Sequence, residues 1–228
     1  MRGGRSGGKG GSKGGASTKP RLDRKEKSAS VKEKSDEPMS EQTKLANMRE
    51  FAQDEKLLFT PVPSDAGAAV VRVIYAYPNT YTVGICSLGY QLVWRWLAES
   101  STVHVARLFT DASEPLMRNP DLIGFSFSWE LDYANVLALL EDLSIPTRAE
   151  DRDETHPLVF GGGPVLTTNP EPYSDFFDCV LLGDGEDMLF AFLDAVKATS
   201  GLPHSRRERL VALAQVPPPP GYHLPPLQ

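Results

Sequence analysis

Cysteine is scarce in this chain, which has 228 residues and only two thiols, Cys86 and Cys179. Two cysteines are too few for a disulfide framework, so we expect a reducing compartment. Neither belongs to a CxxC or CxxxCxxC motif, and no Cys and His stand at the spacing of a zinc site. The sequence therefore predicts no metal ligands and no iron–sulfur cluster within this chain.

Long apolar runs are also missing. No stretch reaches the roughly 18 apolar residues that a membrane-spanning helix needs, so no membrane partner is expected. The N-terminus starts with basic residues, but no apolar segment follows them, and a secretory signal peptide is not expected. Residues 1–20 contain no acidic side chain, as is usual for organelle transit peptides. We therefore expect a cytoplasmic or plastid protein.

Catalytic and phosphate-binding motifs are absent as well. The glycines match neither the GxGxxG fingerprint nor a P-loop, because no Gly-Lys-Ser or Gly-Lys-Thr follows them. The four histidines are scattered, and no Ser-His-Asp or Cys-His arrangement can be read. The sequence therefore identifies no catalytic residue.

Charge is distributed unevenly along the chain. Residues 1–37 hold eleven Lys or Arg and five Asp or Glu, whereas the remaining residues carry a net charge of −12. A folded part this acidic argues against a nucleic-acid partner. The Gly-, Lys- and Ser-rich segment 1–45 has almost no apolar side chains, so we expect it to be a disordered basic tail.

The rest of the chain divides by composition. Residues 46–68 are expected to lead into the fold, and a short helix is predicted between residues 40 and 59. A folded domain is predicted over residues 69–215. The proline-rich segment 216–228 cannot continue any regular element and is predicted to be a linker.

Within the predicted domain, apolar runs alternate with helical patterns. Strands are predicted at residues 69–78, 102–109, 121–128, 157–161 and 178–183, and helices at residues 87–100, 129–145, 186–196 and 206–215. This alternation predicts an α/β fold of the flavodoxin or Rossmann type, with a mostly parallel five-stranded sheet and helices on both faces.

Apolar side chains at helical spacing predict one face of each helix. In the helix at residues 87–100, Leu88, Leu92 and Trp96 recur at i, i+4 and i+8 with Val93 and Leu97 beside them, and Ser87 is the predicted N-cap. The other two stripes consist of Tyr133, Val136, Leu137, Leu140 and Leu143, and of Leu189, Phe192, Leu193 and Val196.

Glycine-bearing loops follow four of the predicted strands, at residues 79–89, 124–128, 161–164 and 183–186. The carboxyl ends of parallel strands meet at one edge of a sheet, where ligands bind in such folds. Glycine lets a ligand reach backbone N–H groups, but it equally serves tight turns. The candidate cofactor-binding residues are Gly84, Gly89, Gly124, Ser126, Gly161, Gly162, Gly163, Gly183, Asp184, Gly185 and Glu186.

The polar candidates also have a structural interpretation. Asp184 and Glu186 precede a predicted helix, where acidic side chains satisfy free N–H groups and suit the helix dipole. Ser126 and Ser128 end the third strand and are equally suited to cap the helix that follows. The residues alone leave both interpretations open.

Four segments in this order resemble one family: "YPNTYTVGICSLGYQLVWRWL", "LIGFSFSWELDYANVLALLE", "PLVFGGGPVLTTNPEPYSDFFDCVLLGDGE" and "QVPPPPGYHLP". They are similar to the N-terminal half of an uncharacterised radical SAM protein family with a cobalamin-binding-type domain. The resemblance covers about residues 69–226, and its most specific part is the ordered set "GGGP", "NPEP", "DFFD" and "GDGE".

The resemblance implies a Rossmann-like corrinoid-binding domain followed by a TIM-like radical SAM barrel. In the family, a CxxxCxxC motif of the barrel ligates a [4Fe–4S] cluster and binds S-adenosylmethionine. This chain has neither those cysteines nor the length for a barrel, so by itself it is not expected to cleave S-adenosylmethionine. We expect it to stop before a radical SAM domain, which would be its partner in cis.

One family feature is missing from the first loop. Corrinoid domains carry Asp-x-His-x-x-Gly after the first strand, and the histidine binds cobalt, but this loop reads "NTYTVGICSLG". Cobalamin would therefore have to bind without a histidine ligand from the protein. The leading expectation is a corrinoid-binding module that is not catalytic alone. The alternatives are a ligand-free interaction module, packing on a barrel or as a homodimer, and one part of a complete radical SAM iron–sulfur enzyme.

Overall fold

The structure is a computed structural model, and it describes residues 39–62, 71–183, 185–199, 205–215 and 222–223. The predicted tail up to residue 38 lies outside the described residues, as do residues 216–221 and 224–228 of the predicted linker. In the described part, no helix is long and apolar enough to cross a membrane.

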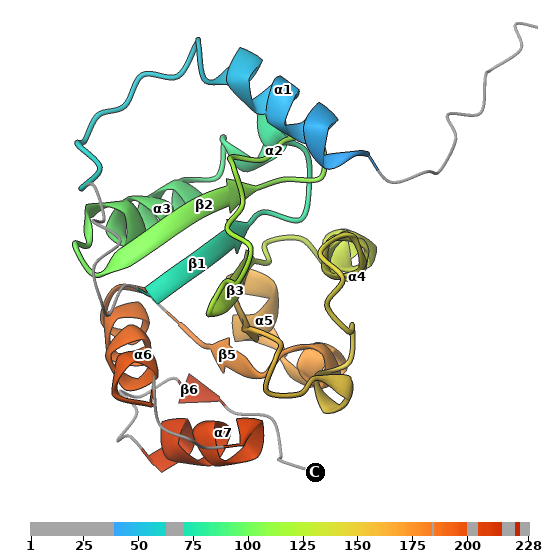
Figure 1. The fold of residues 1–228 in the computed structure, drawn as a ribbon, viewed down its shortest axis with the longest axis vertical. Helices are drawn as coiled ribbons and strands as arrows, with labels where there is room; N and C mark the ends of the chain where they lie inside the picture. The colour runs from blue at the N-terminus through green and yellow to red at the C-terminus, as the bar shows by residue number, and fades with distance from the viewer. Residues whose placement is uncertain (1–38, 63–70, 184, 200–204, 216–221, 224–228) are drawn as a thin grey trace, which may run out of the picture. The chain divides into compact units, whose positions relative to one another are not determined.

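Five parallel strands form the centre of the domain in the order β2-β1-β3-β4-β5 (Figure 1), which confirms the predicted α/β class. They are β1 (Val71–Ala76), β2 (Val103–Leu108), β3 (Leu122–Ser126), β4 (Leu158–Gly162) and β5 (Cys179–Leu181). The order is that of a flavodoxin-like doubly wound sheet. Their β-branched and aromatic runs show little alternation, because residues on both faces of the strands are buried.

A sixth strand extends this sheet. Residues Tyr222–His223 form β6, which pairs antiparallel with β5 in the register Leu181↔Tyr222 and Val180↔His223. The prediction that residues 216–228 form no regular element is therefore wrong at these two residues. The β-propensity of the Tyr-His pair was hidden in a segment otherwise dominated by proline.

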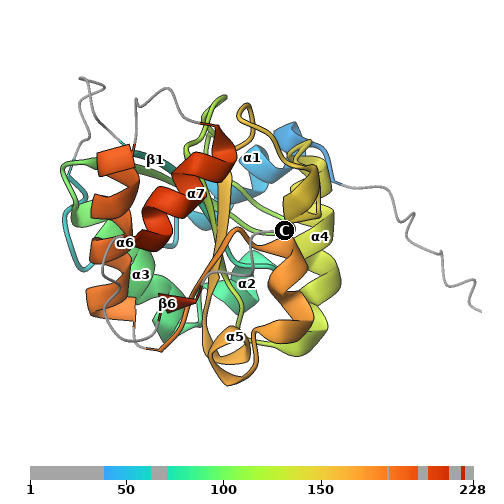
Figure 2. The same ribbon diagram turned by 90° about the horizontal axis from the view of Figure 1, so that it is seen from below.

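Helices cover both faces of the sheet (Figure 2). One face packs against α3 (Leu88–Glu99), α6 (Gly185–Thr199) and α7 (Arg206–Gln215). The other packs against α4 (Tyr133–Asp142) and α5 (Pro164–Thr168). Short 3-10 turns lie at Glu130–Asp132, Ala149–Asp151 and Glu171–Phe176.

The faces of two helices match the sequence patterns. In α6 the predicted stripe is buried, and in α4 Val136 and Leu140 are buried together with Leu139. The helix predicted at residues 129–145 begins later, since Trp129 is extended and α4 starts at Tyr133.

Helix α3 is rotated from the predicted face, of which Leu97 is buried and Val93 and Trp96 are half-buried against the core. Ser87 caps it as predicted, with its hydroxyl accepting the N–H of Tyr90. Tyr90 and Trp94 are buried, whereas Leu88 and Leu92 are exposed. The ring of Tyr90 stacks on Tyr75 of β1 at a centroid distance of 4.9 Å, and this contact orients the helix.

The segment before the sheet is tied to it by a buried cation. Helix α1 (Glu41–Phe51) begins inside the predicted tail, and the segment after it brings Glu55 to Arg107 at the end of β2. Arg107 donates to both carboxylate oxygens of Glu55 at 2.7 and 3.0 Å and also pairs with Glu114. Its guanidinium lies 4.1 Å from the ring centroid of Trp94. The lead-in segment is therefore anchored by charge as well as by packing.

Candidate functional site

The four glycine loops meet at one edge of the sheet, as the sequence predicted. They follow β1, β3, β4 and β5, whose carboxyl ends share this edge because the strands are parallel. After β1 the chain forms the short helix α2 (Tyr81–Gly84). The edge is therefore the candidate functional site, and the surroundings of its glycines decide what it can bind.

Three of these glycines make room for aromatic rings of the domain itself. A Cβ atom at Gly124 would lie 2.2 Å from Cζ of Phe160, and one at Gly84 would lie 2.6 Å from Cε1 of Phe109. A Cβ atom at Gly161 would lie 2.5 Å from Leu166. The space beside these glycines is therefore filled by the protein core.

The other glycines lie at the surface of the edge or define its turns. Gly163 and Gly183 have φ values of +114° and +87°, which residues with a side chain rarely adopt. Gly89 has no atom within 4 Å of a Cβ position, and Gly162 and Gly185 allow ordinary contacts only. Gly163 also faces the carbonyl of Phe127 at 2.7 Å from its Cβ position, so a turn there requires glycine for two reasons.

The polar candidate residues differ in burial, as the glycines do. Ser126 is buried in β3 and bonds with the hydroxyl of Tyr75, whose pKa is raised by burial, with this bond opposing the shift. Neither Ser126 nor Ser128 caps the following helix, because the cap positions are Trp129 and Asp132. Glu186 is exposed in α6. Asp184 lies outside the described residues.

A hydrogen bond joins the loops after β1 and β3. Nδ2 of Asn79 donates to Oδ1 of Asp132 at 2.7 Å, and Asn135 donates to the carbonyl of Pro78 at 2.9 Å. Asp132 is buried, and this burial raises its pKa, while the bond from Asn79 acts in the opposite direction. The two loops are therefore held against each other, a pairing that the sequence analysis did not anticipate.

The same two loops expose large apolar side chains. Leu131 and Leu88 are 80% and 78% exposed, Trp129 is 58% exposed, and Val83 is also exposed. We call these four residues the apolar rim. Val83 lies in α2 and Leu88 at the start of α3, and the hydrogen bond between Asn79 and Asp132 holds this segment against the one that carries Trp129 and Leu131. Exposed apolar residues that gather in this way are typical of an interaction surface.

A family model described as "Radical SAM proteins, N-terminal" matches residues 71–223. The chain belongs to this family. The match starts at the first residue of β1 and ends at the last residue of β6. The whole sheet, with its closing antiparallel strand, therefore forms the radical SAM N-terminal domain.

A curated relative of this radical SAM N-terminal domain is the uncharacterized protein MJ0966 of Methanocaldococcus jannaschii. The two sequences are 24% identical over 127 residues, which cover 55% of this chain and 27% of the relative. The chain thus spans about a quarter of the length of that relative. No solved structure matches the chain.

The described residues of the radical SAM N-terminal domain fit a corrinoid poorly at this edge. A corrinoid is a broad, flat ring system, but the positions beside Gly84, Gly124 and Gly161 are occupied by the protein's own side chains. Residues 77–89, which follow β1, contain no histidine to bind cobalt. Open space lies beside Gly89 and Gly183, where no atom is within 4 Å of a Cβ position, and not beside the three packed glycines.

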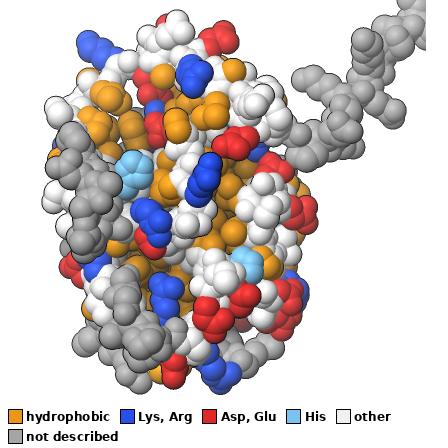
Figure 3. Space-filling view, in the orientation of Figure 1, with side chains coloured by type: hydrophobic (Ala, Val, Ile, Leu, Met, Phe, Trp, Pro, Cys, Tyr) orange, Lys and Arg blue, Asp and Glu red, His pale blue; other side chains and the backbone are white. Residues whose placement is uncertain are grey.

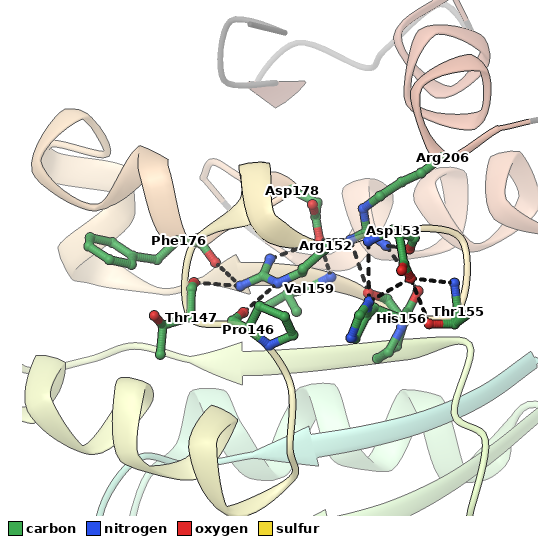
Figure 4. Close-up of polar contacts among 11 residues, drawn as sticks. Pro146, Thr147, Arg152, Asp153, Thr155, His156, Val159, Phe176, Asp178 and Arg206 are labelled. Carbon is green, nitrogen blue, oxygen red and sulfur yellow. Dashed lines mark hydrogen bonds and ion pairs between the residues drawn. The ribbon is translucent and has the colours of Figure 1, made fainter.

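A second polar cluster lies near the start of β5 (Figure 4). Asp178, the last residue of "DFFD", is buried and accepts hydrogen bonds from Arg152 at 3.0 Å and Arg206 at 2.5 Å. The same oxygen, Oδ2, accepts the backbone N–H of Val159 at 2.7 Å. One carboxylate therefore faces two buried guanidinium groups.

Backbone carbonyls complete the cluster. Arg152 donates to the carbonyls of Pro146, Thr147 and Phe176, and Arg206 donates to those of Asp153, His156 and Pro157. Burial lowers the pKa of Arg152, with Asp178 acting in the opposite direction. The cluster fastens α7 and the loop before β4 to β5. It is a structural clamp, which the sequence analysis missed because its members are far apart in the chain.

Proposed function

We propose that this domain is a docking module that packs its apolar rim against the radical SAM domain of a longer protein. The observation that carries the proposal is the exposure of Val83, Leu88, Trp129 and Leu131 on two loops that a hydrogen bond holds together. A rim of this kind suits a permanent protein contact, because apolar and aromatic side chains dominate the centres of such interfaces.

Two further observations support this occupant. The family is defined as the N-terminal part of radical SAM proteins, and the matched segment covers only 27% of the curated relative. About three quarters of that relative's length therefore lies outside the matched segment, which leaves room for a further domain. Among the described residues of the edge, Asp132 is the buried carboxylate, and it accepts a hydrogen bond from Asn79 rather than facing an open site.

The alternative occupant of the edge is a corrinoid, as the family resemblance implies. The filled space beside Gly84, Gly124 and Gly161 argues against it, and these glycines have a sufficient explanation in packing. Gly163 and Gly183 have the positive φ of turns, Gly162 ends β4 and Gly185 begins α6, and none of these roles requires a ligand. We therefore propose that the domain takes part in a radical SAM enzyme without holding its cofactor.

Leu131→Glu tests the docking proposal. We expect this change to weaken binding of a separately produced radical SAM domain of the same organism by at least about tenfold, because it buries a charge in the interface. The free domain should remain equally stable, since Leu131 is 80% exposed. Sedimentation velocity with labelled domain gives the dissociation constant, and circular dichroism gives the melting temperature.

Leu58→Glu is the matched control. Leu58 is 88% exposed but belongs to the lead-in segment, so its replacement should change binding by less than about twofold. An equal loss of binding in both variants, or no complex with the unaltered domain, contradicts the proposal. If the unaltered domain forms a homodimer that Leu131→Glu dissociates, the rim binds a second copy and the proposed occupant is wrong.

A further inference from the structure

The connection between β2 and β3 contains no helix. Residues 109–121 run back across the sheet with a single isolated bridge between Leu108 and Ser113. In doubly wound folds a helix normally covers the sheet at such a crossover. A cavity of about 830 Å³ remains here, on the face that also carries α4. We call it the β2–β3 groove.

The floor of the β2–β3 groove is apolar, whereas its walls combine apolar and charged side chains. Ile74, Ile123 and Leu108 come from the strands and Leu139 from α4. Half-buried side chains, among them Leu116, Met117, Leu143 and Ile145, add to them. Figure 3 shows hydrophobic surface between charged side chains near the middle of this face. The groove therefore offers apolar contact to an elongated ligand.

The cations of the groove fall into two groups. Lys44 pairs with Asp142 at 2.7 Å, and Arg72 donates to both carboxylate oxygens of Asp121. Among the described residues, no carboxylate forms an ion pair with Arg118 or Arg209, which also line the groove. Two of its cations are thus available to an anion.

Of the two arginines, Arg209 has a buried hydrogen-bond donor that lacks an acceptor among the described residues. Its Nε is buried and has no hydrogen-bond partner in the described part of the chain. Burial lowers the pKa of Arg209, and the positive charge of Arg206 acts in the same direction, while Asp121 opposes it. A buried donor without an acceptor costs free energy, and an anion in the groove would supply the acceptor.

The geometry points to a binding site for an amphipathic monoanion, whose apolar body lies on the strand floor and whose carboxylate contacts Arg209 and Arg118. Both arginines line the groove, and the carboxylate of Asp121 acts on Arg209. The volume of about 830 Å³ lies in the range of small-molecule sites.

The acidic side chains of the groove restrict the ligand to a single charge. Glu41, Glu141 and Glu154 line it together with the paired Asp121 and Asp142. A polyphosphate or nucleic acid would meet these like charges, whereas a monocarboxylate needs only one cationic end. This site is separate from the apolar rim and does not depend on the docking proposal.

Sodium octanoate and its neutral isostere octanamide are the probes, used with the intact chain. Isothermal titration calorimetry should show octanoate binding at least about tenfold more tightly than octanamide, because only the carboxylate makes charge-assisted hydrogen bonds to the arginines. Octanoate should also raise the melting temperature, by an amount that grows with the logarithm of its concentration above the dissociation constant. Equal affinity for the two probes, or no octanoate binding below about 10 mM, overturns the proposal.

Two substitutions locate the site. Arg209→Gln should weaken octanoate binding about tenfold and leave octanamide unchanged, since it removes the charge alone. Arg118→Gln, on an exposed residue that folding does not require, should weaken octanoate binding about threefold. Arg49→Gln, on the exposed side of α1, is the control and should have no effect. Octanoate affinity that is unaltered in both groove variants contradicts the assignment.

Discussion

Asp178→Asn should lower the free energy of unfolding by about 3–5 kcal/mol, the usual cost of breaking a buried ion pair from one side. The substitution keeps the shape of the side chain but removes the charge that faces Arg152 and Arg206. Two guanidinium groups then remain in the interior with neutral acceptors alone, namely the backbone carbonyls and the amide oxygen of the new asparagine. Urea denaturation followed by tryptophan fluorescence measures the change.

Asp175→Asn provides the matched control from the same "SDFFD" segment. Asp175 pairs with Arg148 at 3.2 Å, but both side chains are about half exposed, so its loss should cost less than about 0.5 kcal/mol. If the two variants lose similar stability, the cluster around Asp178 is not the clamp that fastens α7 to the sheet. A large loss for Asp178→Asn alone supports the assignment.

Gly124→Ala should destabilise the domain by about 3 kcal/mol through overpacking. The new Cβ atom would lie 2.2 Å from Cζ of Phe160, whose buried ring cannot move aside. The backbone has nowhere to shift, because Gly124 pairs with Tyr75 on one side and with Phe160 on the other. Thermal and urea unfolding both report the loss.

A second substitution identifies the cause. Gly124→Ala combined with Phe160→Leu should recover at least half of the lost stability, because the smaller side chain frees space. Gly89→Ala is the control: no atom lies within 4 Å, and its place in α3 should yield a gain of about 0.5–1 kcal/mol. Failure of Phe160→Leu to restore stability would show that Gly124 is required for another reason.

The sheet was predictable from sequence because its strands are buried on both faces. Runs such as "VRVIYA" read as strands, and their alternation with helices predicted both the parallel sheet and the shared glycine edge. The register and the pairing of loops were not accessible, since they depend on contacts such as Asn79 with Asp132 between separate β–α units.

The orientation of α3 shows why a pattern can select the wrong face. The helix carries apolar residues on more than one side, so Leu88, Leu92 and Trp96 form as regular a stripe as Tyr90, Trp94 and Leu97. Stacking of Tyr90 on Tyr75 and the cation–π contact of Trp94 with Arg107 decide which stripe is buried. The outward Leu88 then becomes part of the apolar rim.

The role of each glycine could not be predicted from the sequence either, because it depends on which atoms lie beside it in the fold. A sequence cannot distinguish a glycine that admits a ligand from one that admits a phenylalanine ring of its own core. At Gly84 and Gly124 the partner is Phe109 or Phe160, residues that lie 25 and 36 positions away in the chain. The same limitation concealed the clamp, whose three side chains come from positions 152, 178 and 206.

Titration of the chain with hydroxocobalamin, followed by visible absorbance, tests most directly whether the glycine edge is filled by the domain itself. We expect no change in the spectrum up to about 1 mM cofactor, which limits the binding free energy to weaker than about −4 kcal/mol. A saturable spectral shift in the micromolar range, abolished by a bulky substitution at half-buried Gly162 or exposed Gly183, would contradict the packing explanation and restore a corrinoid site at this edge.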